Sequence, residues 1–200
     1  NVLKTFSIEN EPVVELVNNR EREYIFADLP DIGYSTDIDT VMASSYQVKK
    51  QLQQIVKIEQ PITNTLLYKR ILRIWNLTRV TTRLQVFIDN LLEDAYKDPL
   101  SGDTIIYWED EEKAKDCDFY RINSKRDILD IPILEVMSAA RYAIEQQISM
   151  PTEDLKRLTS QLLGFSRKGN NLDMVTEQTI QLLVDQGIFS HANGMVSMNN

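Results

Sequence analysis

Apolar residues in the first half of the chain recur at the spacing of one-sided helices. Early in this half they stand at i, i+4, i+7 and i+8, and they are Val48, Leu52, Ile55 and Val56. We predict a helix from residue 44 or 45 to Gln60, because Pro61 cannot continue it. A second helix is expected to begin at Thr63 or Asn64, which are good N-caps, and to end at Asn76. A third helix then carries the apolar residues from 84 to 92.

The second half of the chain repeats this helix order. We expect a helix opening at Ile131–Pro132, a second over 152–163 and a third over 169–186, the last two ended by Gly164 and Gly187. A shift of 88 positions aligns the halves, pairing Leu67 with Leu155, Ile74 with Leu162, Arg79 with Arg167 and Leu84 with Leu172. A repeat of this length predicts two copies of one structural unit.

Each copy is also expected to carry a β-hairpin after its third helix. In the first copy, the strand-like segments 104–108 and 118–122 flank an acidic tip. In the second copy, residues 188–190 and 195–198 flank a turn at Asn193–Gly194. Three helices followed by such a wing give the order of a winged helix-turn-helix.

Residues 1–43 are not expected to be helical. Segments 13–17 and 24–29 are rich in strand-forming residues, Asn18–Asn19 suits a hairpin turn, and the remainder is typical of an extended linker. We therefore predict an α+β chain that is mainly helical. It consists of an extended, partly strand-forming arm (1–43) and two tandem winged helix-turn-helix units, unit one (44–125) and unit two (126–200).

Several dispersed motifs resemble a known family. They are A-D-L-P (27–30), I-V-K-I-E-Q-P-I (55–62), W-N-L-T-R (75–79), I-I-Y-W (105–108), F-Y-R (119–121), R-D-I-L-D-I-P (126–132) and L-L-G-F-S-R-K-G-N-N (162–171). In this order they resemble the C-terminal domain of unknown function of large bacterial superfamily I DNA/RNA helicase–nuclease proteins. The resemblance implies an accessory module whose partners include the helicase and nuclease domains upstream in a longer parent chain.

Charge and composition narrow the function. The formal net charge of −8 argues against a general nucleic-acid coat. Residues 44–93 are the exception, with eight Lys or Arg against three Asp or Glu, so unit one is expected to provide the main nucleic-acid contact and unit two a weaker one. With one cysteine, Cys117, and no apolar run long enough to span a membrane, we expect a cytoplasmic location.

The start of each third helix is where helix-turn-helix proteins meet the major groove. Arg and Lys neutralise phosphates, Thr bonds to phosphate oxygens and Asn pairs with adenine. The candidate nucleic-acid-binding residues are Lys69, Arg73, Arg79, Thr82 and Arg83 in unit one, and Arg167, Lys168 and Asn171 in unit two. The competing interpretation is that Arg79 and Arg167 tie each turn to its own unit, while Arg83, Lys168 and Asn171 form solvated surface.

The sequence predicts no catalytic residue, metal or cofactor. Asp103, Glu111 and Lys113 imitate the acidic-plus-lysine pattern of metal-dependent nucleases, but a charged loop supplies such loose spacing by chance. His191 has no neighbouring cysteine or second histidine to complete a zinc site. Trp75 and Trp108 are able to stack on bases, although core packing is the stronger expectation for Trp75, and core or inter-domain packing for Trp108.

These observations favour a non-catalytic accessory module that binds DNA weakly and with strong salt dependence. The alternative is a protein-interaction module that docks on the upstream nuclease or motor domain. The two hypotheses differ in where positive potential lies. Cations of unit one that converge on an open face favour nucleic acid, whereas cations covered by acidic residues or by unit two favour protein interaction.

Overall fold

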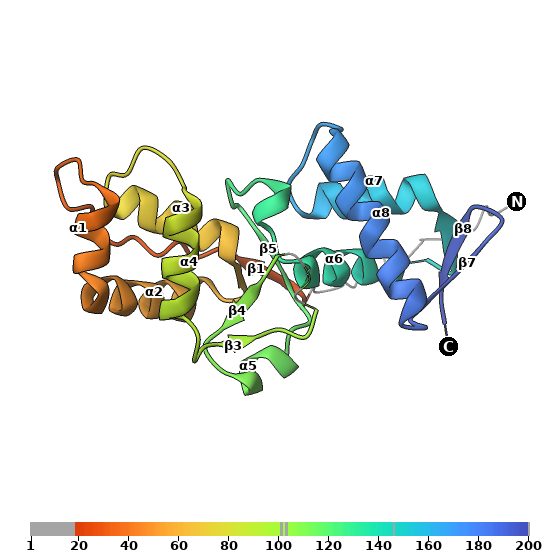
Figure 1. Cartoon of the computed structure of the whole chain (residues 1–200). Helices are drawn as coiled ribbons and strands as arrows, with labels where there is room; N and C mark the ends of the chain where they lie inside the picture. Colours follow the sequence, from red (N-terminus) through yellow and green to blue (C-terminus); the bar gives the residue numbers. More distant parts are fainter. Residues whose placement is uncertain (1–18, 101, 103, 146, 200) are drawn as a thin grey trace, which may run out of the picture.

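The computed structural model describes residues 19–100, 102, 104–145 and 147–199 (Figure 1). These residues form helices and three small β-sheets, which confirms the α+β class. Unit one and unit two lie at opposite ends of the long direction of the molecule in Figure 1. No helix in the described residues is long and apolar enough to cross a membrane.

Unit one packs helices against a small sheet. In chain order its elements are α2 (Ser45–Glu59), β2 (Ile62–Thr63), α3 (Asn64–Ile74), α4 (Thr82–Leu91), β3 (Tyr96–Lys97) and β4 (Ile106–Trp108). Strand β4 lies between β2 and β3 and is antiparallel to both. Helices α3 and α4 begin where they do because the hydroxyls of Thr63 and Thr81 accept hydrogen bonds from the first-turn amides.

Unit two repeats this arrangement. Its elements are the 3-10 helix η1 (Ile128–Asp130), α6 (Ile133–Glu145), β6 (Ser149–Pro151), α7 (Thr152–Leu162), α8 (Asn170–Asp185), β7 (Phe189–Ala192) and β8 (Met195–Met198). Strand β8 lies between β6 and β7 and is antiparallel to both. Helices α6, α7 and α8 begin 88 positions after α2, α3 and α4, so the sequence repeat is also a structural repeat.

The second helix of each unit ends in the same way. Asn76 and Gly164, which are 88 positions apart, adopt left-handed conformations with φ of 48° and 89°. The following amide then donates to the carbonyl five residues back, from Leu77 to Leu72 at 3.0 Å and from Phe165 to Ser160 at 2.9 Å. This is the Schellman arrangement, which satisfies carbonyls that the helix end would leave unpaired.

The arm differs from the prediction. Its strand is β1 (Glu21–Glu23), which pairs in parallel with β5 (Tyr120–Ile122), and residues 24–29 form no strand. Residues 38–43, predicted to be extended, form the helix α1 (Ile38–Ala43), because the Asp37 carboxylate caps it by accepting from Thr40 N at 2.8 Å. The predicted strand 13–17 and Asn18 of the predicted turn lie outside the described residues.

The predicted hairpin of unit one is also wrong. Its second strand corresponds to β5, which pairs with the arm, whereas β4 pairs with β3 and β2. The acidic segment is therefore not a hairpin tip. It forms the short helix α5 (Glu111–Lys115), capped by the Asp110 carboxylate at 2.9 Å from Lys113 N. In Figure 1, α5 lies at the lower edge of the molecule.

Each unit has an apolar core, and two smaller apolar clusters combine residues of both units. The predicted inward faces of the helices are buried, and the unit-one core also takes Ala27 and Val41 from the arm. Trp75 and Trp108 are 3% and 2% exposed, which confirms core packing for both. Their indole N–H groups donate to Gln51 (2.9 Å) and Asp98 (3.0 Å). Neither ring is free to stack on a base.

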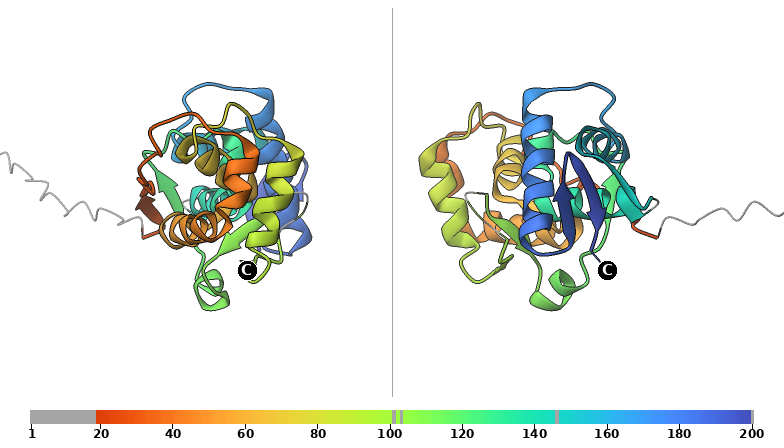
Figure 2. Two further views of the ribbon diagram at one scale, coloured as in Figure 1. Left: turned by 60° about the vertical axis from the view of Figure 1, so that its left-hand side comes forward. Right: turned by 90° about the vertical axis from the view of Figure 1, so that its right-hand side faces the viewer.

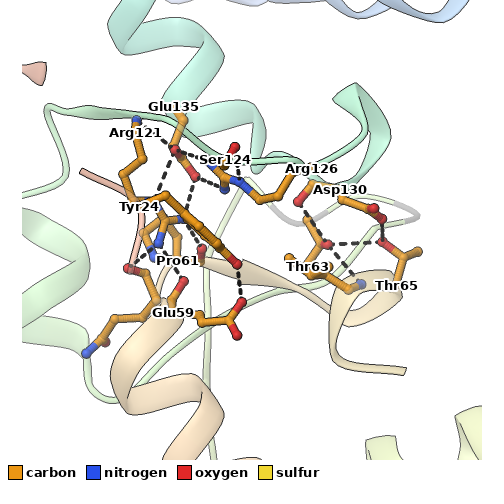
Figure 3. A network of polar contacts seen from close by, with 12 residues as sticks. Tyr24, Glu59, Pro61, Thr63, Thr65, Arg121, Ser124, Arg126, Asp130 and Glu135 are labelled. Atoms are coloured by element: carbon orange, nitrogen blue, oxygen red, sulfur yellow. Dashed lines mark hydrogen bonds and ion pairs between the residues drawn. The ribbon is translucent and has the colours of Figure 1, made fainter. Parts of the chain in front are cut away.

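The two units are joined by a network of buried polar side chains around Arg121, Arg126 and Glu135, here called the seam (Figure 3). Arg121 of β5 donates to the main-chain oxygens of Glu59 and Pro61, each at 2.7 Å, where α2 gives way to β2. The same guanidinium donates to Glu135 of α6 at 3.1 Å, and Arg126 donates to Glu135 at 2.7 and 2.9 Å. Burial alone would raise the pKa of Glu135, but Arg121 and Arg126 hold that pKa below its ordinary value.

The arm enters the same seam through Tyr24. Its hydroxyl donates to Glu59, whose carboxylate also accepts from Arg70 at 2.8 Å and from Ala27 N at 3.1 Å. Burial and the negative charge of Glu59 raise the pKa of Tyr24 to about 12. Since Arg121 bonds to both α2 and α6, the seam fixes the two units and the arm relative to each other.

Candidate nucleic-acid interface

The two turns that precede α4 and α8 lie on the same side of the molecule. The α3–α4 turn (75–81) and the α7–α8 turn (163–169) both lie along the upper edge of Figure 1. They keep that height in both views of Figure 2, which are turned about the vertical axis. The seam fixes this arrangement, so a single extended ligand is able to contact both turns.

Unpaired cations lie on these turns. Arg79, on the first, and Arg167 and Lys168, on the second, are exposed, and none forms a hydrogen bond or ion pair within the described residues. The interpretation in which Arg79 and Arg167 tie each turn to its own unit requires contacts that the structure does not contain. Thr82 and Asn171, at the starts of α4 and α8, are exposed beside them.

The remaining unit-one candidates are all paired with carboxylates. Lys69 Nζ lies 2.6 Å from the buried Asp130 of η1. The Arg73 guanidinium lies 3.1 Å from Asp28, and that of Arg83 lies 2.8 Å from Asp39. Acidic groups therefore form ion pairs with three of the cations expected to face nucleic acid, and the three side chains stay 45–57% exposed. By the criterion set from the sequence, this result favours protein interaction for unit one.

The α7–α8 turn borders a hollow of about 460 Å³. At its side lies Lys156, whose buried amine forms ion pairs with Asp173 (2.6 Å), Glu177 (3.0 Å) and Glu153 (3.3 Å). Burial opposes the charged amine, but these carboxylates raise its pKa above the ordinary value. Four cations and two carboxylates line the hollow, and of these cations only Arg167 and Lys168 form no ion pair within the described residues.

Sequence reasoning did not include Lys125 among the candidates, and it missed the acidic partners. Lys125, in the segment before η1, is exposed and unpaired within the described residues. Its position in the R-I-N-S-K-R stretch was a signal for it. Asp28, Asp39 and Asp130 gave no comparable signal, because each lies more than forty positions from the cation that it meets.

The groups considered for catalysis do not assemble into a site. Glu111 and Lys113 form separate ion pairs with Lys115 and Glu109, and Asp103 lies outside the described residues. Burial, followed by the charge of Glu135, raises the pKa of the Cys117 thiol to about 12, so the reactive thiolate is scarce. The exposed His191 shares a hydrogen bond of 3.1 Å with Thr152. Within the described residues, no group of three or more His, Cys, Asp or Glu side chains is arranged to hold a metal.

Comparison with known proteins gives one match. The model of a protein family of unknown function (DUF3320) matches residues 43–86, from the end of α1 to the middle of α4. No curated protein and no solved structure matches the chain. The matched segment contains all five unit-one candidates, but the description of the family assigns no activity to them.

Proposed function

We propose that this chain is a non-catalytic accessory module that binds DNA weakly through two winged helices. The helix order and the sheet orders β2-β4-β3 and β6-β8-β7 support this assignment, because a winged helix returns its last strand between the first two. The resemblance to helicase–nuclease proteins supports the role of an accessory to an upstream motor and nuclease.

The observation that carries the proposal is the pair of turns on one side of the molecule. Their unpaired cations are Arg79, Arg167 and Lys168, and phosphate is the ligand that exposed cations at a helix start commonly meet. We therefore propose unit two as the main contact with DNA, whereas the sequence predicted unit one. Three cations and a net charge of −8 make weak, sequence-independent binding the expected mode.

Fluorescence anisotropy with labelled duplex, single-stranded and forked DNA tests the proposal. Three phosphate contacts reduce affinity about 40-fold between roughly 50 and 200 mM salt, a logarithmic slope of about −2.7. We expect Arg167→Ala/Lys168→Ala to lower that slope to about −0.9, because one contact is left. Absence of binding to every probe at low salt contradicts the proposal.

A charge-matched control separates a local contact from a general field effect. Lys97 of β3 and Lys115 of α5 belong to elements at the lower edge of Figure 1, away from both turns. The variant Lys97→Ala/Lys115→Ala removes the same charge as Arg167→Ala/Lys168→Ala. It is expected to leave the salt slope unchanged.

The second candidate function is docking on the upstream nuclease or motor domain. The carboxylate-paired cations Lys69, Arg73 and Arg83 favour it, as does Val86, an apolar residue of α4 that is 54% exposed. Titration calorimetry with the separately produced nuclease and motor domains of the parent chain tests this function. A complex that Val86→Asp abolishes supports docking, and no heat with either domain contradicts it.

A further inference from the structure

Two arginines of unit one are held by the arm. Arg73, in the last turn of α3, meets Asp28, and Arg83, in the first turn of α4, meets Asp39. Residues 24–43 contain four aspartates and no lysine or arginine. At the equivalent positions unit two has Gln161 and Asn171, so no such pairs exist there.

These ion pairs are on the surface. The side chains of Asp28 and Asp39 are 82% and 74% exposed, and those of Arg73 and Arg83 are 45% and 57% exposed. The Asp28 and Asp39 carboxylates form no other hydrogen bond or ion pair within the described residues. Within the described residues, the two carboxylates therefore form hydrogen bonds and ion pairs only with the guanidinium groups of Arg73 and Arg83.

The arm that carries these carboxylates is firmly attached to unit one. Ala27 and Val41 are almost fully buried in the unit-one core. The amide of Ile32 donates to the Ile74 carbonyl at 3.0 Å, and the Asn76 side chain donates to the Tyr34 carbonyl at 3.3 Å. In both Figure 1 and Figure 2 the arm runs beside the α3–α4 turn. The packing of the arm thus holds the backbone of Asp28 and Asp39 close to α3 and α4.

We propose that Asp28 and Asp39 set the affinity of unit one for nucleic acid by occupying, as carboxylates, the places where phosphates would meet Arg73 and Arg83. This inference rests on the proposed DNA-binding function. A carboxylate and a phosphate offer a guanidinium the same kind of oxygen acceptor, so the two compete for it. In the native protein the main contacts are then Arg79 and unit two.

The test compares the native chain with Asp28→Asn/Asp39→Asn by anisotropy on a labelled duplex at about 50, 100 and 200 mM salt. Each freed arginine that meets a phosphate adds about 0.9 to the magnitude of the salt slope. We expect the double variant to steepen the slope by about 1.8 and to bind more tightly at the lowest salt. Adding Arg73→Ala/Arg83→Ala to that variant is expected to remove the whole gain.

The control variant is Glu112→Gln/Asp116→Asn. It changes the net charge by the same amount, but it acts on α5 and on the residue after it, at the lower edge of Figure 1, where neither side chain is ion-paired. Thermal melting of each variant by circular dichroism shows that the fold is kept. An equal gain in the control would mean that total charge, and not release of the arginines, controls affinity, and it would overturn the inference.

The remaining outcomes separate the inference from the function on which it rests. Native binding with an unchanged slope in Asp28→Asn/Asp39→Asn overturns the inference and leaves the proposed function intact. Binding only by the variant supports the inference and contradicts native binding through the two turns. Absence of binding by either protein overturns both.

Discussion

Units one and two share a backbone but compensate their positive charges differently. In unit two, Lys156 meets Glu153, Asp173 and Glu177, all on its own helices α7 and α8. In unit one, Lys69 meets a carboxylate on η1, and Arg73 and Arg83 meet carboxylates on the arm. A structural repeat therefore does not imply a functional repeat, because neighbouring segments decide which cations remain available.

In each unit a side-chain link joins the second and third helices at equivalent positions, but the residues that form it differ. Tyr68 and Asp89 link α3 to α4 through a hydrogen bond of 2.7 Å. Lys156 and Glu177, each 88 positions later, link α7 to α8 at 3.0 Å. The geometry of the link is conserved within the molecule, while its chemistry changes from a phenol–carboxylate bond to an ion pair.

The largest effect is expected where the units meet. Glu135→Gln leaves Arg121 and Arg126 buried beside a neutral side chain, and removing one partner of a buried ion pair costs about 3–5 kcal/mol. Urea unfolding followed by circular dichroism measures this loss. As a control, Glu153→Gln removes an exposed partner of Lys156 and is expected to cost less than about 1 kcal/mol. Equal losses would mean that the seam does not stabilise the fold.

The same variant predicts a pH dependence. The folded pKa of Glu135 is depressed, so its contribution to stability is complete above the unfolded value of about 4.3 and is lost as the pH falls through the folded value. The difference in unfolding free energy between the native chain and Glu135→Gln should therefore be constant from pH 6 to 8 and shrink below about pH 4. A difference that grows on acidification would contradict this sign.

A smaller effect is expected at the equivalent helix links. Tyr68→Phe removes a hydrogen bond to a charged group from a nearly buried position, at a cost of about 1.5–3 kcal/mol. Lys156→Met leaves behind carboxylates that are 59–75% exposed and hydrated, so its cost is expected to be about 1 kcal/mol or less. Urea unfolding of both variants measures the difference, and a greater loss for Lys156→Met would reverse the comparison.

The smallest effect concerns the ends of α3 and α7. Gly164→Ala places a Cβ on a left-handed backbone, which costs about 1 kcal/mol, although no atom lies near enough to clash. Asn76→Gly at the equivalent position keeps this conformation but loses the exposed hydrogen bond to the Tyr34 carbonyl, so we expect it to cost less than about 1 kcal/mol. Thermal melting of the two variants gives the comparison, and an unaffected Gly164→Ala would show that the turn relaxes.

The helices and the repeat were predictable because helical periodicity extends over whole turns. Thr63 marked the start of a helix, and Asn76 and Gly164 marked helix ends, because helix capping depends on neighbouring residues in the sequence. Strands β2 and β6 were missed because two or three residues are too few to show an alternating pattern. Helix α1 was missed although Asp37 is a good N-cap, because the helix has only six residues.

The candidate site was only partly predictable. The exposed turn cations Arg79 and Arg167 follow from the repeat itself, since a turn at a helix start faces solvent. The ion pairs of Arg73 and Arg83 did not follow, because they depend on how the arm packs against unit one. The misassigned hairpin of unit one has a similar cause, as β5 alternates like a hairpin strand yet pairs with β1 from the arm.

The seam also determines which fragments of this protein keep their buried charges paired. Arg121 and Glu135 lie on opposite sides of the boundary between units one and two. A fragment that ends at residue 125 keeps Arg121 without its buried counter-ion, and a fragment that begins at residue 126 keeps Glu135 with one of its two arginines. Each 88-residue repeat is thus a structural unit, but cutting the chain between the repeats separates buried charges from their partners. The smallest fragment suited to expression extends from the arm through unit two.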